Sequence, residues 1–243
     1  MCLIVVALDR SARYPFVVAA NRDEQHARPT HTAAWWPVLP NVFGGRDLRA
    51  GGSWLAIDRR GRMAAVTNVR DPPPEPAARS RGALVAEYLG GDDPALVYAA
   101  RAARDGARFG AFNLLVFDGT ELHYSSNRSA AAALGSGVHA LSNAPRDVEW
   151  PKIATAREGV VGLLAHAMPL EPLFELLTRR QDTGPFEERY RSAHFVVGPT
   201  YGTRSSTVVL RDDAGVVTFV ERSFDAEGRR VGEVRETFSI DRG

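Results

Sequence analysis

Short apolar runs alternate with polar turns along this chain, and the pattern predicts strands that are mostly joined as hairpins. Three hairpins are expected, at 3–20, 53–68 and 112–125. The third turns at Asp118-Gly119, a dipeptide favoured in short hairpin loops. Further strands are expected at 138–142, 195–198, 206–210, 216–222 and 230–238. The sheets are therefore expected to be mostly antiparallel.

Helical patterns separate these groups of strands, at 80–105, 151–167 and 170–180. The first is broken at Gly90-Gly91 and restarts at Asp92-Asp93-Pro94, a combination typical of a helix N-terminus. Irregular loops are expected in the Pro- and Trp-rich segment that ends at Pro37 and over 71–76, which holds four prolines. The order of elements predicts an α+β fold whose helices cover the outer faces of sheets, in one domain over 1–243.

Composition narrows the class of partner. The 243 residues are 44% hydrophobic and 24% charged, which is ordinary for a globular protein. A net charge of +1 gives no basic field, so neither nucleic acid nor a membrane surface is an expected partner. Almost every basic residue is arginine, and Lys152 is the one lysine. A single cysteine argues against a disulfide framework or a cysteine-rich zinc site, and no metal is expected.

The start of the chain bears on localisation and on chemistry. The apolar run 3–8 is too short to span a membrane and has no basic segment before it, so a cytoplasmic protein is expected. If Met1 is removed, Cys2 becomes the first residue, with a thiol that titrates at about 8.5 and an amine at about 7.7–8.0. Such an amine can act as base for its own side chain. Taken alone, Cys2 is better explained as a small residue that starts a buried strand.

Polar residues at the predicted strand ends change that interpretation. Asn21-Arg22-Asp23-Glu24 directly follows an apolar run, and an arginine near Cys2 would lower the thiol pKa while a carboxylate could orient the terminal ammonium. Asn68 and Asn143 also end apolar runs, where amides can donate to a developing oxyanion. Arg204 enters another run in the same way. Each of these residues singly is more often a turn former or a solvated strand end.

The combination resembles the NRDE family, also called the transport and Golgi organization protein 2 family. The resemblance covers nearly the whole chain in order, and it is carried by Cys2, Asn21-Arg22-Asp23-Glu24, Gly44-Gly45-Arg46-Asp47, Gly51-Gly52-Ser53-Trp54, Thr67-Asn68-Val69-Arg70, Phe112-Asn113-Leu114-Leu115, Leu141-Ser142-Asn143, Trp150-Pro151-Lys152 and Arg204-Ser205-Ser206-Thr207. It implies the N-terminal nucleophile hydrolase fold, a four-layer αββα sandwich of two mostly antiparallel sheets.

A more distant resemblance implies a mechanism. Cys2, Arg22, Asn68, Asn143 and Arg204 are similar to the catalytic set of penicillin V acylases and bile salt hydrolases, in which a terminal cysteine attacks an amide and two asparagines form the oxyanion hole. Those enzymes place an aspartate three residues after the arginine, where this chain has Gln25. Asp23 and Glu24 are the nearby carboxylates. A continued strand would put Arg22 and Glu24 on one face and Asp23 on the other, which leaves both open.

Two functions are therefore expected to compete. The first is an amidohydrolase that acts on a small carbon–nitrogen amide through Cys2, Arg22, Asp23, Asn68, Asn143 and Arg204, with no cofactor. The second, which the family resemblance implies, is a protein that binds and mobilises haem, or an acyl-coenzyme A or lipid, on the same fold. A thiolate, an amine or a histidine could ligate haem iron, but the histidines show no ligand spacing: His26, His31, His123, His139, His166 and His194.

Overall fold

The computed structural model describes residues 2–70, 77–164, 170–181 and 183–241, which form two compact units. Unit 1 comprises Met1–Ala27, Ser136–Ser142 and Val148–Phe238, and unit 2 comprises Arg28–Gly135, Asn143–Asp147 and Ser239–Gly243. The expected loop over 71–76, the retention or loss of Met1, and His166 lie outside the described residues. Every described helix is too short or too polar to cross a membrane.

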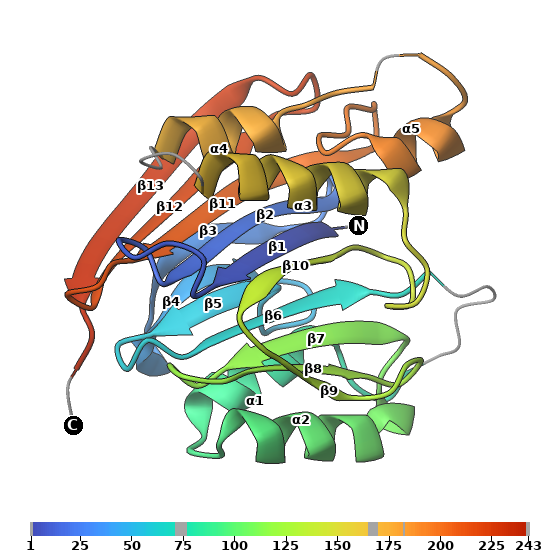
Figure 1. The fold of residues 1–243 in the computed structure, drawn as a ribbon. Helices are drawn as coiled ribbons and strands as arrows, with labels where there is room; N and C mark the ends of the chain where they lie inside the picture. Colours follow the sequence, from blue (N-terminus) through green and yellow to red (C-terminus); the bar gives the residue numbers. More distant parts are fainter. Residues whose placement is uncertain (1, 71–76, 165–169, 182, 242–243) are drawn as a thin grey trace. The chain divides into compact units, whose positions relative to one another are not determined.

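Unit 1 is built on a six-stranded sheet in the order β10-β1-β2-β11-β12-β13. Its strands are β1 (Cys2–Leu8), β2 (Phe16–Gln25), β10 (Gly137–Leu141), β11 (Tyr201–Arg211), β12 (Val216–Phe224) and β13 (Arg230–Ser239). Its helices are α3 (Pro151–Leu164), α4 (Leu170–Leu177) and α5 (Phe186–Ser192). Helices α3 and α4 lie along one face of this sheet (Figure 1).

Strand alternation decides which side chains of unit 1 face those helices. Leu3 and Val5 of β1 and Val17 of β2 are buried together with Val160 of α3 and Phe174 of α4. Each fully buried side chain of this size contributes about 1.5–3 kcal/mol. Because successive residues of a strand point to opposite faces, the even-numbered residues of β1 and β2 project from the other face of the sheet.

Unit 2 has a seven-stranded sheet in the order β3-β4-β5-β6-β7-β8-β9, with consecutive strands antiparallel. The strands are β3 (Thr30–Trp36), β4 (Leu39–Asp47), β5 (Leu55–Asp58), β6 (Met63–Asn68), β7 (Phe112–Phe117), β8 (Leu122–Ser126) and β9 (Ala132–Leu134). Helices α1 (Gly82–Gly90) and α2 (Ala95–Arg104) cover one face of this sheet (Figure 1), and a short 3-10 turn, η1 (Gly106–Arg108), follows them.

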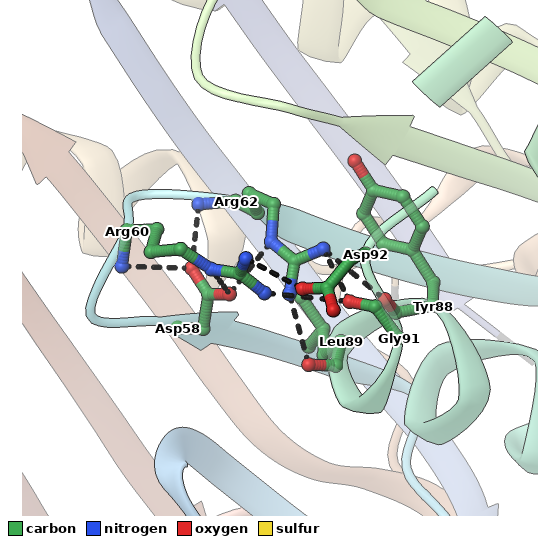
Figure 2. A network of polar contacts seen from close by, with 7 residues as sticks. All are labelled: Asp58, Arg60, Arg62, Tyr88, Leu89, Gly91 and Asp92. Atoms are coloured by element: carbon green, nitrogen blue, oxygen red, sulfur yellow. Dashed lines mark hydrogen bonds and ion pairs between the residues drawn. The ribbon is translucent and has the colours of Figure 1, made fainter. Parts of the chain in front are cut away.

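A buried arginine joins helix α1 to the β5–β6 hairpin (Figure 2). The Arg62 guanidinium donates hydrogen bonds to the carbonyl oxygens of Leu89 and Gly91, at 3.0 and 2.7 Å, and so satisfies acceptors that a helix C-terminus leaves open. Its Nε also donates to the buried carboxylate of Asp58 at 2.7 Å. Arg60 extends the network from Asp58 to Asp92 at the surface.

The structure confirms the hairpins at 53–68 and 112–125 and the split of 80–105 into two helices, and it corrects four expectations. Strand β2 continues through the polar run to Gln25. The Pro- and Trp-rich segment forms β3 and β4, while 195–198 is not a strand. Helix α2 begins without a side-chain cap from its own segment; instead Asp118, in the β7–β8 turn, accepts from the Ala95 amide at 3.3 Å.

Candidate functional site

Cys2 begins strand β1 and is half-buried. Its Cα pairs directly with that of Arg22 on β2, and directly opposed residues project from the same face with Cβ atoms about 4.5–5.5 Å apart. The hydroxyl of Ser142 donates to the Cys2 carbonyl oxygen at 2.8 Å, which fixes this strand end to the residue that follows β10. The thiol is therefore held beside the guanidinium that the sequence predicts for it.

Opposing influences act on the Cys2 thiol. Burial raises its pKa above the ordinary value, and the nearby charge of Asp23 raises it as well. The positive charge of Arg22 and a backbone hydrogen bond from Asp23 lower the pKa but do not cancel the effect of burial. At neutral pH the thiol is the dominant form, so nucleophilic attack by sulfur would require a base that removes its proton.

A glutamate and a second arginine accompany Arg22 on strands β2 and β11. Arg22 is 5% exposed and pairs with Glu24, two residues along the same face, at 3.8 Å. Arg204 is the extra residue of a β-bulge in β11, between Thr203, which pairs with Asp23, and Ser205, which pairs with Arg22. The pKa of Arg204 is lowered by burial and by the like charge of Arg22. The bulge thus places a second guanidinium within electrostatic range of the first.

Asp23 points to the helix-covered face of the sheet and is 1% exposed. Its carboxylate accepts a hydrogen bond from the Thr203 hydroxyl at 2.6 Å, and its carbonyl oxygen accepts one from the Tyr201 hydroxyl at 3.0 Å. Burial raises the pKa of Asp23, while Lys152, Thr203 and Arg22 each act to lower it. Asp23 is the carboxylate whose charge acts on Cys2, whereas Glu24 forms the ion pair with Arg22.

The two predicted oxyanion donors lie together in unit 2. Asn68 ends strand β6, and the Asn143 amide donates to the Asn68 carbonyl oxygen at 2.5 Å. The backbone amide of Arg70 donates to the Asn143 carbonyl oxygen at 2.8 Å. Asn113 of β7 braces the same segment through a 2.9 Å bond from its amide nitrogen to the Ala144 carbonyl oxygen. Cys2, Arg22, Asp23 and Arg204 are grouped in unit 1, so a single site formed by all six residues stays a prediction.

Sequence reasoning missed two supports of the unit 1 group. The sequence pattern predicts no role for Thr203, although its hydroxyl accepts from the Val196 amide and thereby fixes the bond to Asp23. The sequence pattern predicts no role in the site for Lys152, yet this residue is fully buried and its charge acts on Asp23. The signal that could have pointed to Lys152 is its status as the one lysine in the chain.

Other polar residues in the predicted motifs are structural. The amide of buried Asn21 donates to the carbonyl oxygens of Leu177 and His194 at 2.8 Å each and accepts from Ser206 at 2.6 Å. His194 bonds Leu176 and Thr155 through its two ring nitrogens. Within the described ranges, no three His, Cys, Asp or Glu side chains gather as a metal site would require.

Comparison with known proteins places this arrangement in a class and in a family. A solved N-acylethanolamine-hydrolyzing acid amidase ortholog from Caenorhabditis elegans matches 86% of the chain and 92% of its own length, with a TM-score of 0.52 and 11% identity. A mutant conjugated bile acid hydrolase from Clostridium perfringens matches 99% of the chain and 97% of its own length, with a TM-score of 0.54 and 10% identity. These likenesses show the fold, which is that of the N-terminal nucleophile hydrolases.

The family follows from sequence similarity. The family model described as Transport and Golgi organisation 2 matches residues 1–226. A Transport and Golgi organization 2 homolog from Mus musculus is 32% identical over 257 residues, and one from Bos taurus is 34% identical over 258 residues; each comparison covers 92% of this chain and 93% of the relative. The chain belongs to the Transport and Golgi organisation 2 family, as the sequence resemblance implied.

Proposed function

We propose that this chain is an amidohydrolase that cleaves a small carbon–nitrogen amide through Cys2 once Met1 has been removed. The observation that carries the proposal is the placement of a chain-leading cysteine directly opposite buried Arg22 and within the electrostatic reach of buried Asp23. The fold gives further support, because two solved neighbours with this fold are named as an amidase and a conjugated bile acid hydrolase.

The proposed reaction has two steps. The terminal amine takes the proton of the Cys2 thiol, and the sulfur attacks the amide carbonyl carbon. The carbon–nitrogen bond breaks, the leaving amine takes the proton from the terminal ammonium, and an acyl thioester remains on Cys2. Water, deprotonated by the same amine, then attacks the thioester and releases the acid and the thiol.

Each neighbouring residue has a proposed role in that reaction. Arg22 and Arg204 supply positive charge near the thiolate, and Asp23 orients the terminal ammonium. Asn68 and Asn143 would donate to the oxyanion that forms on the carbonyl oxygen. No cofactor is needed, and the cytoplasm stays the predicted location. The alternative function is binding and mobilisation without catalysis. Its ligand would be a haem, or an acyl-coenzyme A or a lipid, instead of an amide.

The proposal is tested by screening small acyl amides against two forms of the protein, the mature chain and a chain whose Met1 is blocked by a tag. The mature form is expected to turn over a responsive amide, with a rate that rises with pH as the terminal amine deprotonates. Blocked protein and the Cys2→Ala variant are expected to be inactive, because one lacks the base and the other the nucleophile. Cys2→Ser is expected to retain little activity, since a hydroxyl is a far weaker nucleophile than a thiol near neutral pH.

Equal turnover by the mature and blocked forms would contradict the terminal-amine mechanism. Circular dichroism of each form controls for folding, and Cys2→Ala removes only one atom beyond Cβ, a modest change for a core. Absence of turnover by every form, combined with saturable haem binding near one equivalent, would favour the alternative function.

A further inference from the structure

Lys152 occupies a position where an ammonium group is costly. It is the second residue of α3, it is 0% exposed, and burial lowers its pKa below the ordinary value. The partial positive charge at a helix N-terminus also disfavours a cation in the first turn. Its Nζ lies 5.6 Å from the centre of the Trp150 ring and 5.3 Å from that of Tyr190, and such aromatic faces stabilise a cation only partly.

Two groups of the candidate site partly offset the cost of burying the Lys152 ammonium, because their negative charges favour its protonated form. Asp23 is the main group that raises the pKa of Lys152, and Cys2 acts in the same direction. The relation is reciprocal, because Lys152 is the strongest of the groups that lower the pKa of Asp23. The three side chains all belong to unit 1, where Cys2 and Asp23 come from the neighbouring strands β1 and β2 and Lys152 from the helix that covers them.

Stability alone does not explain this pair of opposite charges. Burial raises the pKa of Asp23 and lowers that of Lys152, so the ionised form of each is disfavoured by the fold. Buried ion pairs contribute little net stability, and apolar side chains of similar volume often replace them without loss. The charged pair of Asp23 and Lys152 is therefore better explained by the chemistry of the Cys2 site than by its contribution to stability.

We propose that Lys152 is a positioning residue of the Cys2 site, whose ammonium holds the buried Asp23 carboxylate in its ionised form within electrostatic range of the thiol. The inference deepens the proposed hydrolase, because an ionised Asp23 is what would orient the terminal ammonium. The chemistry of the side chain explains why position 152 is a lysine although the other Lys or Arg positions of the chain are arginines. Its compact ammonium interacts as a point charge, whereas the planar guanidinium of arginine carries five donors that a dry site would have to satisfy.

Other titratable and charged groups around this pair are few. Helix α4 turns the apolar side chains of Leu173, Phe174 and Leu177 into the core beneath β2. His194 is close enough for Lys152 to lower its pKa, but its ring bonds Thr155 and Leu176. The groups that interact with Asp23 or Lys152 are Cys2 on β1, Arg22 on β2, Tyr190 on α5, His194 after α5, Tyr201 on β11 and the terminal amine.

The test uses the rate at which iodoacetamide alkylates the protein, because the chain has one cysteine and the reaction therefore reports Cys2 alone. Rates are measured from pH about 5 to about 10 for the wild type, Lys152→Met and the double variant Lys152→Met/Asp23→Asn. The thiol and the terminal amine both titrate in the upper part of this range, so the wild type is expected to show no inflection below about pH 7. Lys152→Met is expected to show an added inflection at lower pH, because Asp23 without its counter-ion takes up a proton there. The double variant is expected to lose this added inflection.

Lys152→Arg keeps a permanent charge, so it is expected to show no added inflection, although its extra donors should make the protein less stable than the wild type. If Lys152→Met loses its circular dichroism signal, Lys152→Gln, which keeps a polar group of similar reach, takes its place. A Lys152→Met profile that superimposes on the wild type, or an extra inflection that persists in the double variant, would overturn the proposal. Alkylation needs no substrate, so failure of the amide screen leaves this test intact.

Discussion

At the scale of single residues, the site depends on where strand β2 sends its consecutive side chains. Arg22 and Glu24 project from one face and form an ion pair, while Asp23 projects from the other, into a buried setting fixed by Thr203. The two carboxylates therefore have different consequences. Asp23 raises the pKa of the Cys2 thiol, and Glu24 offsets the charge of the neighbouring arginines.

Replacement of each carboxylate by its amide separates these roles. Asp23→Asn is expected to lower the pKa of Cys2, because it removes a negative charge that disfavours the thiolate; the alkylation rate of Cys2 should then rise at lower pH than in the wild type. The matched control, Glu24→Gln, changes a half-buried carboxylate that is paired with Arg22 and should shift the profile less. A larger shift in Glu24→Gln would identify Glu24 as the carboxylate that acts on the thiol.

At the scale of elements, the Arg62 network fixes helix α1 to its hairpin. Arg62→Ala is expected to reduce the free energy of unfolding by about 3 kcal/mol, because it leaves the buried Asp58 carboxylate with only the half-exposed Arg60 as counter-ion and removes the buried donor to the carbonyl oxygens of Leu89 and Gly91. Arg60→Ala is the matched control. Its side chain is 49% exposed, so its loss should cost less than about 1 kcal/mol. Urea unfolding of both variants measures the difference, and equal losses would contradict the assignment.

The elements also show what could be predicted from sequence. Hairpins at 53–68 and 112–125 were predictable because turn chemistry and alternation are local. The extension of β2 over a polar run was not, since Asn21 and Asp23 are satisfied by partners more than 150 residues away: Asn21 by Leu177 and His194, and Asp23 by Thr203. For the same reason, Cys2 and Arg22 could be proposed from their motifs, whereas the role of Lys152 depends on a helix packing that no local pattern reveals.

At the scale of the whole molecule, neither unit is a continuous stretch of chain. Each is assembled from three segments, and the chain passes from one unit to the other after Ala27, Gly135, Ser142, Asp147 and Phe238. To fold either unit, the chain must bring together the two ends of long intervening segments, and those segments belong to the other unit. The two units are therefore expected to unfold in one cooperative transition despite their separate cores.

Hydrogen exchange of the backbone amides tests this expectation in both units at once. Peptides from β1 and β2 report unit 1, and peptides from β6 and β7 report unit 2. If unfolding is cooperative, Arg62→Ala, which lies in unit 2, should lower the free energy of opening by the same amount in all four strands, because their slowest amides exchange only through global unfolding. Arg60→Ala should leave all four nearly unchanged. Faster exchange in β6 and β7 with wild-type exchange in β1 and β2 would show that the units open separately.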